Sequence, residues 1–432
     1  MNRYAVRADL LDFTADPGWG KPHDASAGLR WRPDHWLLVD GSGRIAGVQA
    51  EAPEPSWLRL DHRGRLLMPG FIDTHVHMPQ LEVLASFGTE LLHWLETYTF
   101  PAELRYADPE ACSAGSNRFL DALLAHGTTG AVVFPTVHKA SAEALFTAAE
   151  QRGMRVIAGK CLMDRNAPPG LTDTVDSAER DSTELIERWH GRGRLAYAHT
   201  VRFAPTSSDA QLALAGRLLA AHPGTYLQTH VAENRDELNW VAELFPDARS
   251  YLDVYARHGL VGARSVLAHG IWLDADDRAL LAREGAQIAH SPSSNLFLGS
   301  GLADWRGLEQ EGVAVTLASD VGGGTSLSML RTMADAYKVQ ALRGVRLSAW
   351  KALYAATRGA ATALGLEREI GSLDIGCVAD FALWQYAVGP VAAARDAAVS
   401  SLHERLFALM TLGDERNVVS TYVAGQCLYA AA

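Results

Sequence analysis

Two histidines separated by one residue follow an apolar run in the segment MPGFIDTHVHMPQ, residues 68–80. Residues i and i+2 of a β-strand point to the same side, so His75 and His77 can reach one ion if the run is a strand. Gln80 follows them, and Asp73, which precedes them, is expected to be structural. Imidazole ligands without cysteine suit Zn²⁺, with Fe²⁺ and Mn²⁺ as alternatives, which makes this segment the first candidate for a metal site.

Further residues that bind metals or move protons end other short apolar segments. They are Arg202 and Phe203 in HTVRF, His230 and Glu233 in THVAEN, His269 in LAHG, His290 in AHSPSSN and Asp320 in ASD. Each has an ordinary structural explanation on its own, such as a hydrogen-bonded histidine, a turn aspartate or a glutamate at a helix start. Their recurrence at corresponding positions of successive segments favours one shared site.

The segments that carry these residues alternate with helical stretches. Eight short apolar or β-rich runs between residues 66 and 320 are separated by stretches such as SAEALFTAAEQRG and RDELNWVAELFP. Eight β/α units in succession predict a (β/α)8 TIM barrel, with a doubly wound open sheet as the alternative. The carboxyl ends of barrel strands share one face, which carries the active site. We therefore expect the polar residues to meet at that face.

Both ends of the chain are rich in β-type sequence. YAVRADLLDF and WLLVDGSGRIAGVQA stand near the start, and GSLDIGCVADFALWQY and VVSTYVAGQCLYA near the end. The turn signal DGSGR indicates a hairpin. We predict that residues 1–66 and 370–432 form one small β-sandwich domain beside a catalytic barrel of residues 67–369, because chain ends often lie close together. The alternative is two unrelated peripheral flaps.

The overall composition narrows the partners and the compartment. A chain of 432 residues, 48% hydrophobic and 21% charged, is long enough for a barrel and a second unit. The net charge of −11, without a basic run, argues against nucleic acid and anionic membranes as partners. Four cysteines without CxxC spacing fit a reducing compartment, and we find neither a signal peptide nor an apolar run near 20 residues. We expect a cytoplasmic protein.

The motifs resemble those of the amidohydrolase superfamily of metal-dependent barrel hydrolases over most of the chain. The resemblance rests on PGFIDTHVH, on LAHG, on ASD and on the histidine of the fifth strand. Within that superfamily the chain is similar to the guanine deaminases, through THVHMPQ, LLHWLETYTFPAE, GTTGAVVFPTVH, VRFAPTSS, THVAEN and SDVGGGTSLSML. DTHVH alone indicates only the superfamily. The resemblance is narrowed from the superfamily to the guanine deaminases by Gln80, the pair Arg202–Phe203 and the spacing His230-x-x-Glu233.

The resemblance implies one Zn²⁺ per chain, with Fe²⁺ as the alternative. Its ligands would be His75, His77, His230 and Asp320. His269 would either bind the ion or hydrogen-bond to its water, and the proton of that water would pass to Asp320 or His269. Many two-metal members carry a lysine at the end of the fourth strand, where this chain has VRF. We therefore predict a single ion and a structural role for Lys160.

The implied reaction is the hydrolysis of guanine to xanthine and ammonia, in purine catabolism, by a homodimer. Glu233 would shuttle protons, Gln80 and Arg202 with Phe203 would bind the purine, and Trp94 is a further candidate for the pocket wall. A related deaminase acting on an adenosine-like, 8-oxopurine or triazine substrate is the nearest alternative. A non-catalytic scaffold is the alternative of a different class, and the complete set of residues argues against it. His290 receives no role.

Overall fold

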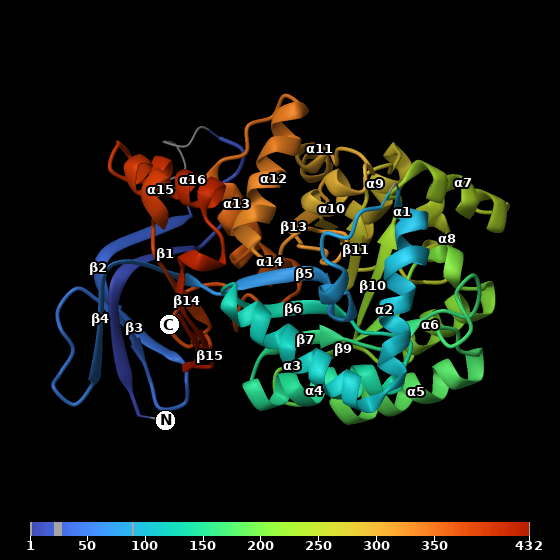
Figure 1. Cartoon of the computed structure of the whole chain (residues 1–432), viewed down its shortest axis with the longest axis horizontal. Helices are drawn as coiled ribbons and strands as arrows, with labels where there is room; N and C mark the ends of the chain where they lie inside the picture. The colour runs from blue at the N-terminus through green and yellow to red at the C-terminus, as the bar shows by residue number, and fades with distance from the viewer. Residues whose placement is uncertain (1, 21–27, 89, 432) are drawn as a thin grey trace.

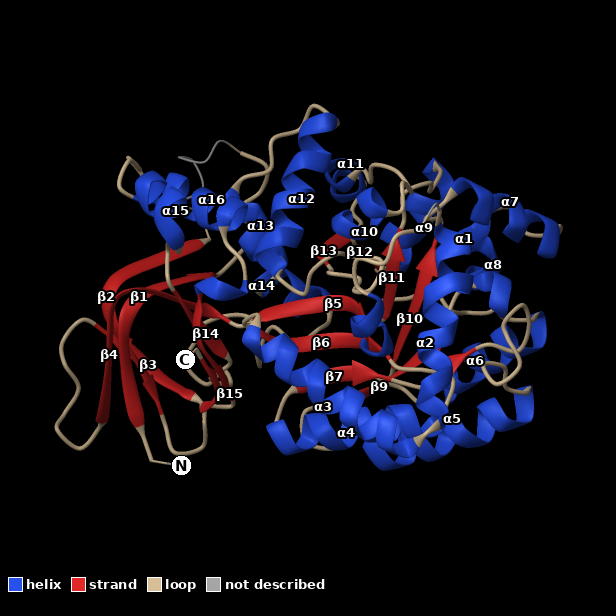
Figure 2. Cartoon of the chain, in the orientation of Figure 1, coloured by secondary structure: helices blue, strands red, loops and turns tan. Residues whose placement is uncertain are grey.

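The computed structural model describes residues 2–20, 28–88 and 90–431 (Figure 1). A barrel surrounded by helices forms the larger part of the molecule, and a strand-rich part lies beside it, at the left of Figure 1. Figure 2 shows the same division by the helices that cover the larger part and the strands that dominate the smaller one. In the described ranges, we find no helix that combines the length and the apolar character needed to span a membrane.

Eight parallel strands form the barrel in chain order. They are β5 (Phe71–His77), β6 (Thr128–Phe134), β7 (Arg155–Ala158), β9 (Leu195–Val201), β10 (Tyr226–Val231), β11 (Ser265–His269), β12 (Gln287–His290) and β13 (Ala314–Leu317). The first and last strands, β5 and β13, nearly close the sheet into a barrel. Near their carboxyl ends, the Asp320 amide donates to the His75 carbonyl at 2.9 Å, and Thr74 Oγ1 donates to the Leu317 carbonyl at 3.0 Å. The predicted barrel is confirmed, and the open sheet is excluded.

Helices follow the barrel strands and cover their outer side. They are α3 (Pro109–Ala125), α4 (Lys139–Arg152), α5 (Val175–Trp189), α6 (Asp209–Ala221), α7 (Arg235–Leu244), α8 (Tyr251–Arg257), α9 (Ala275–Glu284), α10 (Pro292–Phe297), α11 (Trp305–Gln310), α12 (Met329–Leu342), α13 (Ala349–Ala355) and α14 (Arg358–Ala363). Side chains cap many of their starts, as in the capping boxes of Thr174 with Ser177 and Asn234 with Glu237. Because helices cover the strands, β6 and β9 are buried throughout and consist mainly of apolar residues.

The two chain ends share one mixed sheet of seven strands. Its order is β16 (Gln426–Ala430), β15 (Val418–Val423), β14 (Phe381–Trp384), β4 (Leu58–Pro69), β1 (Tyr4–Phe13), β2 (Leu29–Val39) and β3 (Ile45–Gln49). Apolar side chains from both ends pack in one cluster, for example Val6 and Leu37 against Phe381. The prediction of one β unit built from both ends is confirmed, and the idea of separate flaps is wrong.

Three details differ from the sequence-based expectation. The strand expected from Leu66 is divided at Gly70, so its first residues pair with β14 in the sheet of the chain ends. The third barrel strand is divided into β7 and β8 (Cys161–Leu162), and the Ala198 carbonyl approaches the break so closely that a Cβ on Gly159 would lie 1.9 Å from it. Helices α15 (Gly389–Asp396) and α16 (Leu402–Leu412) lie between β14 and β15. The domain limits at residues 66 and 370 stay a prediction.

A short helical column follows β5. It starts with the 3-10 helix η2 (Met78–Val83) and, after a loop, continues through α1 (Leu91–Trp94), the π-helical turn η3 (Leu95–Thr99) and α2 (Phe100–Leu104). Glu90 caps the start of α1 by accepting from the amides of Leu92 and His93. This column brings residues of the LLHWLETYTFPAE segment to the carboxyl ends of the barrel strands (Figure 1).

Candidate active site

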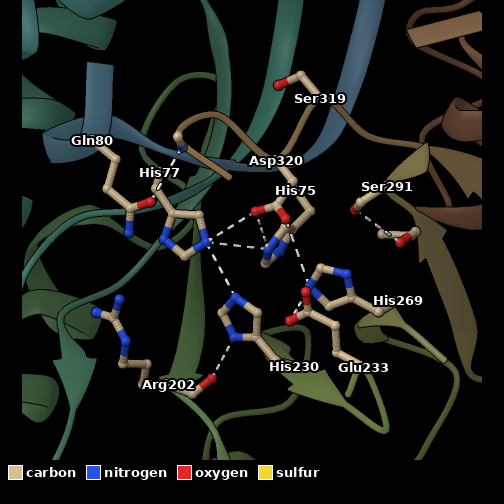
Figure 3. Close-up of polar contacts among 12 residues, drawn as sticks. His75, His77, Gln80, Arg202, His230, Glu233, His269, Ser291, Ser319 and Asp320 are labelled. Atoms are coloured by element: carbon tan, nitrogen blue, oxygen red, sulfur yellow. Dashed lines mark hydrogen bonds and ion pairs between the residues drawn. The ribbon is translucent and has the colours of Figure 1, made fainter. Parts of the chain in front are cut away.

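Three imidazoles meet at the carboxyl ends of β5 and β10. The Nε2 atom of His77 lies 3.2 Å from Nε2 of His75 and 3.2 Å from Nε2 of His230 (Figure 3). His75 and His77 are two residues apart on β5, so both side chains point to the same side, as expected, which is the inside of the barrel. The structure thus brings together three of the predicted ligands.

Asp320 and His269 complete this group. Oδ1 of Asp320 lies 3.2 Å from Nε2 of His75 and 3.3 Å from Nε2 of His77, and its Oδ2 lies 3.7 Å from Nε2 of His269. One ligand atom from each of four residues falls within 4.8 Å of the others: His75, His230, His269 and Asp320. His77 is outside that set, but its Nε2 lies within 3.3 Å of ligand atoms of His75, His230 and Asp320. We call these five residues the strand-end cluster.

The backbone around the strand-end cluster takes an uncommon conformation. His269 has φ 73° and Asp320 has φ 49°, values that non-glycine residues seldom adopt and that recur at functional sites. Asp73 helps to hold Asp320 in place, since its Oδ1 accepts from the Ser319 amide at 3.0 Å and its Oδ2 accepts from the Ser319 hydroxyl. Burial raises the pKa of Asp73 to about 6. Its contacts agree with the structural role expected for it.

Burial favours the neutral form of two imidazoles in the cluster. It lowers the pKa of His77 to about 3 and the pKa of His230 well below its ordinary value; neighbouring histidines add to both effects, and Asp320 opposes them. Although burial opposes it, the nearby His75 and His77 hold the pKa of Asp320 well below its ordinary value. Neutral imidazoles and an ionised carboxylate are the states that bind a divalent cation.

The orientation of His230 also suits a metal ligand. Its Nδ1 lies 2.5 Å from the Arg202 carbonyl, an acceptor that places the ring proton on Nδ1 and leaves the Nε2 lone pair toward the cluster. On His269, Nδ1 lies 2.8 Å from Oδ1 of Asn295, and the buried Nε2 makes no hydrogen bond with the described residues, although Oε2 of Glu233 lies 3.3 Å away. The donor set, with this nitrogen turned toward the cluster, fits a divalent ion.

Glu233 lies beside the cluster. Its Oε2 is 3.3 Å from Nε2 of His269, and its Oε1 accepts from the Ser300 hydroxyl at 2.9 Å. Burial, together with the charge of Asp320, raises the pKa of Glu233 to about 8. A carboxyl group that keeps its proton near neutral pH can act as a general acid and later as a base.

The predicted purine-binding residues line the same cavity as Glu233, and Figure 3 shows Gln80 and Arg202 on the side of the cluster away from Glu233. Gln80 belongs to η2, and Arg202 and Phe203 directly follow β9. Trp94 of α1 is buried, and its Nε1 donates to the Ser86 carbonyl at 3.2 Å. A cavity of about 420 Å³, including space open to solvent, is lined by these four residues together with His77, His230, Glu233, His269, Asp320, Leu91, Leu95 and Leu298.

His290 and Lys160 lie outside the strand-end cluster. His290 is buried at the end of β12 with its ring 5.8 Å from that of Trp305, and it does not join the strand-end cluster. Lys160 is buried in an ion pair with Asp173, whose other oxygen accepts from Gln211 at 2.7 Å. These contacts agree with the structural role expected for Lys160.

Sequence reasoning missed two acidic residues at this site. Glu103 of α2 forms an ion pair with Arg202, and Glu237 of α7 accepts from the Glu233 amide at 3.0 Å and from the Tyr251 hydroxyl at 2.7 Å. Burial and the nearby Glu233 raise the pKa of Glu237 to about 7. Glu103 ends the LLHWLETYTFPAE segment and Glu237 lies in the helical stretch RDELNWVAELFP, but neither received a role, because its burial depends on tertiary packing.

Comparison with known proteins places the chain in a family. The amidohydrolase family matches residues 66–428, and the chain belongs to it. The chain is 45% identical to guanine deaminase of Escherichia coli strain K12, over 98% of this chain and 97% of that one. The solved structure of E. coli guanine deaminase superposes with a TM-score of 0.95 at 44% identity, covering 99% and 100% of the two chains. Guanine deaminase from C. acetobutylicum, with guanine in its active site, has a TM-score of 0.89 at 28% identity, covering 99% and 100%.

Proposed function

We propose that this protein is a guanine deaminase, which hydrolyses guanine to xanthine and ammonia. The observation that carries the proposal is the arrangement of the cavity, in which Glu233 and the strand-end cluster face the hydrogen-bonding groups of Gln80 and Arg202. The similarity to guanine deaminases over almost the whole chain supports the same substrate.

We further propose that the strand-end cluster holds one Zn²⁺ ion. Its imidazole and carboxylate donors suit zinc, and Fe²⁺ or Mn²⁺ accept the same donors. The ion would supply a Lewis acid that lowers the pKa of water at the site. His269 would either bind the ion or hydrogen-bond to its water. The homodimer, the cytoplasmic location and the place in purine catabolism also stay predictions.

Glu233 has the position and the protonation state of a proton shuttle. Water adds to C2 of guanine, so the adjacent ring nitrogen N3 must gain a proton, which Glu233 donates. Asp320 or His269 accepts the proton that the attacking water loses. That proton passes to the amino group on C2, so that ammonia leaves, and the C2 hydroxyl returns its proton to Glu233 as the carbonyl of xanthine forms. The balance is guanine plus water giving xanthine plus ammonia.

Arg202 and Gln80 account for the choice of guanine. Arg202 can donate to O6, and Gln80 can bind the adjacent ring edge, while Phe203 and Trp94 supply apolar walls. Adenine has an amino group where guanine has O6, so it would place donors against donors. Unpaired buried groups of this kind cost enough to reject a substrate.

A substrate panel scored by ammonia release tests this proposal against its nearest alternative. The purified protein is assayed with guanine, adenosine, 8-oxoguanine and a triazine. We expect guanine to have the highest kcat/KM by at least about 100-fold, because recognition by buried hydrogen bonds can discriminate by up to about 10,000-fold or more. A preference for any of the other compounds would replace guanine as the substrate, and no ammonia from any compound in metal-loaded protein would favour the non-catalytic scaffold.

A further inference from the structure

A single buried carboxylate connects the two polar groups assigned to purine binding. Glu103 of α2 is 0% exposed, and it lies behind Gln80 and Arg202. Its Oε1 accepts from Nε2 of Gln80 at 3.1 Å, and both of its oxygens accept from Nη1 of Arg202, at 2.8 and 2.7 Å. The three side chains come from η2, α2 and the end of β9, so no local structure requires them to meet.

Glu103 fixes which way the Gln80 amide points. Oε1 of Gln80 accepts from the Gly322 amide at 3.1 Å, while Nε2 faces Glu103. Rotating the amide by half a turn would set its NH2 group against the Gly322 N–H and its oxygen against a carboxylate, so both contacts would be repulsive. The backbone at Gly322 approaches closely, since a Cβ there would lie 2.8 Å from the Gln80 carbonyl. The amide therefore has one remaining N–H to offer a ligand.

Glu103 also supports the charge of Arg202. The Arg202 side chain is 3% exposed, and its guanidinium carbon lies 5.4 Å from the centre of the Phe100 ring. A buried cation without a partner is strongly unfavourable, so this ion pair is required to keep Arg202 inside the cavity wall. The pair occupies only Nη1, which leaves the rest of the guanidinium outside the contact with Glu103.

We propose that Glu103 is a positioning residue that makes the purine-binding wall a surface of hydrogen-bond donors only. The inference rests on the proposed function and extends it. With Gln80 oriented as a donor and Arg202 held in place, the wall accepts a ligand edge that carries acceptors, as the O6 and N7 atoms of guanine do, whereas N1 of guanine carries a proton. Selection of a 6-oxopurine thus depends on a residue that does not itself touch the purine.

The test replaces Glu103 by glutamine, which keeps the size but removes the charge and permits either orientation of the Gln80 amide. The probes are guanine and 2-aminopurine, which keeps the purine ring and the C2 amino group but lacks O6. We expect E103Q to raise KM for guanine by about 10- to 100-fold, with a smaller change in kcat. The inhibition constant of 2-aminopurine should rise by a smaller factor, about threefold or less, because this ligand lacks the O6 contact with Arg202 and keeps only a ring nitrogen as acceptor on that edge.

Asp173→Asn is the matched control, since it breaks the buried Asp173–Lys160 pair outside the cavity. D173N should lower thermal stability and leave the ratio of the two constants unchanged. Equal weakening of both ligands in E103Q would show a merely structural role and would overturn the inference. If E103Q is insoluble, Glu103→Asp carries the same test, because the shorter side chain keeps the charge but cannot reach both partners. Absence of guanine turnover in the unchanged protein would instead overturn the proposed function.

Discussion

The two walls of the cavity are built in different ways. On one wall, the strand-end cluster consists of side chains placed at or just after the ends of β5, β10, β11 and β13. On the other, Gln80 and Arg202 are held by Glu103, which lies 99 positions before Arg202 in the chain. The first wall follows from the geometry of a barrel, in which strand ends converge. The second depends on a buried ion pair between separate segments.

This difference leads to different expectations for mutation. A change in the strand-end cluster should remove a proposed metal ligand and abolish the reaction. A change on the opposite wall should alter which purine binds, and it should also disturb folding where a buried charge loses its partner.

The largest effect is expected for Asp320→Asn. Loss of the carboxylate charge should reduce metal affinity by more than about 100-fold, beyond the effect of altering residues that only support ligands. Metal content and guanine turnover should fall together, as measured by elemental analysis and xanthine formation. His290→Gln is the matched control, because His290 is a buried histidine of β12 outside the cluster. Full metal content and activity in D320N would remove Asp320 from the cluster's function.

Glu233→Gln should separate proton transfer from metal binding. Because Glu233 is not expected to be a ligand, the variant should keep its metal content and thermal stability. Turnover of guanine should fall by about 100- to 10,000-fold, the usual contribution of a positioned acid or base. Steady-state kinetics with elemental analysis measure both quantities. Near-normal kcat in E233Q would exclude the proton-shuttle role.

Arg202→Ala should act on the opposite wall. We expect kcat/KM for guanine to fall by about 10- to 100-fold, mainly through KM, because a charge-assisted hydrogen bond is lost. The variant should also lose about 3–5 kcal/mol of stability, since Glu103 stays buried without its cation. Kinetics and thermal unfolding report the two effects. An unchanged KM and kcat would place Arg202 outside the recognition of guanine.

Trp94→Phe should have the smallest effect. Phenylalanine keeps an aromatic wall and loses the hydrogen bond from Nε1 to the Ser86 carbonyl, a contribution of about 1 kcal/mol to stability. KM for guanine should change by less than about threefold, since an apolar wall is retained. A fall in kcat as large as that of E233Q would mean that the indole acts directly on the reaction.

The sequence was sufficient to predict the first wall and only half of the second. Alternation along β5 predicts that His75 and His77 point the same way, and the order of the strands predicts where His230, His269 and Asp320 meet them. Residue types and family motifs also placed Gln80 and Arg202 in the cavity.

The supporting residues could not be predicted in the same way. Glu103 stands in a helical stretch, and only the packing of that helix against the barrel makes it a buried partner of Arg202. The contacts of Asn295 with His269 and of Ser300 with Glu233 could not be predicted either, because single polar residues in loops and short helices give no periodic signal. The division of the third strand likewise coincides with a close contact between Gly159 and another strand, which the sequence does not show.

The most direct test of the account is guanine turnover with and without the metal. Xanthine and ammonia are measured for the purified protein, for the same protein after treatment with a chelator, and after addition of Zn²⁺, with elemental analysis at each stage. We predict conversion of guanine that is lost with the metal and restored by zinc. Undiminished conversion by protein shown to be free of metal would contradict the role of the strand-end cluster, and no xanthine from zinc-loaded protein would contradict the proposed reaction.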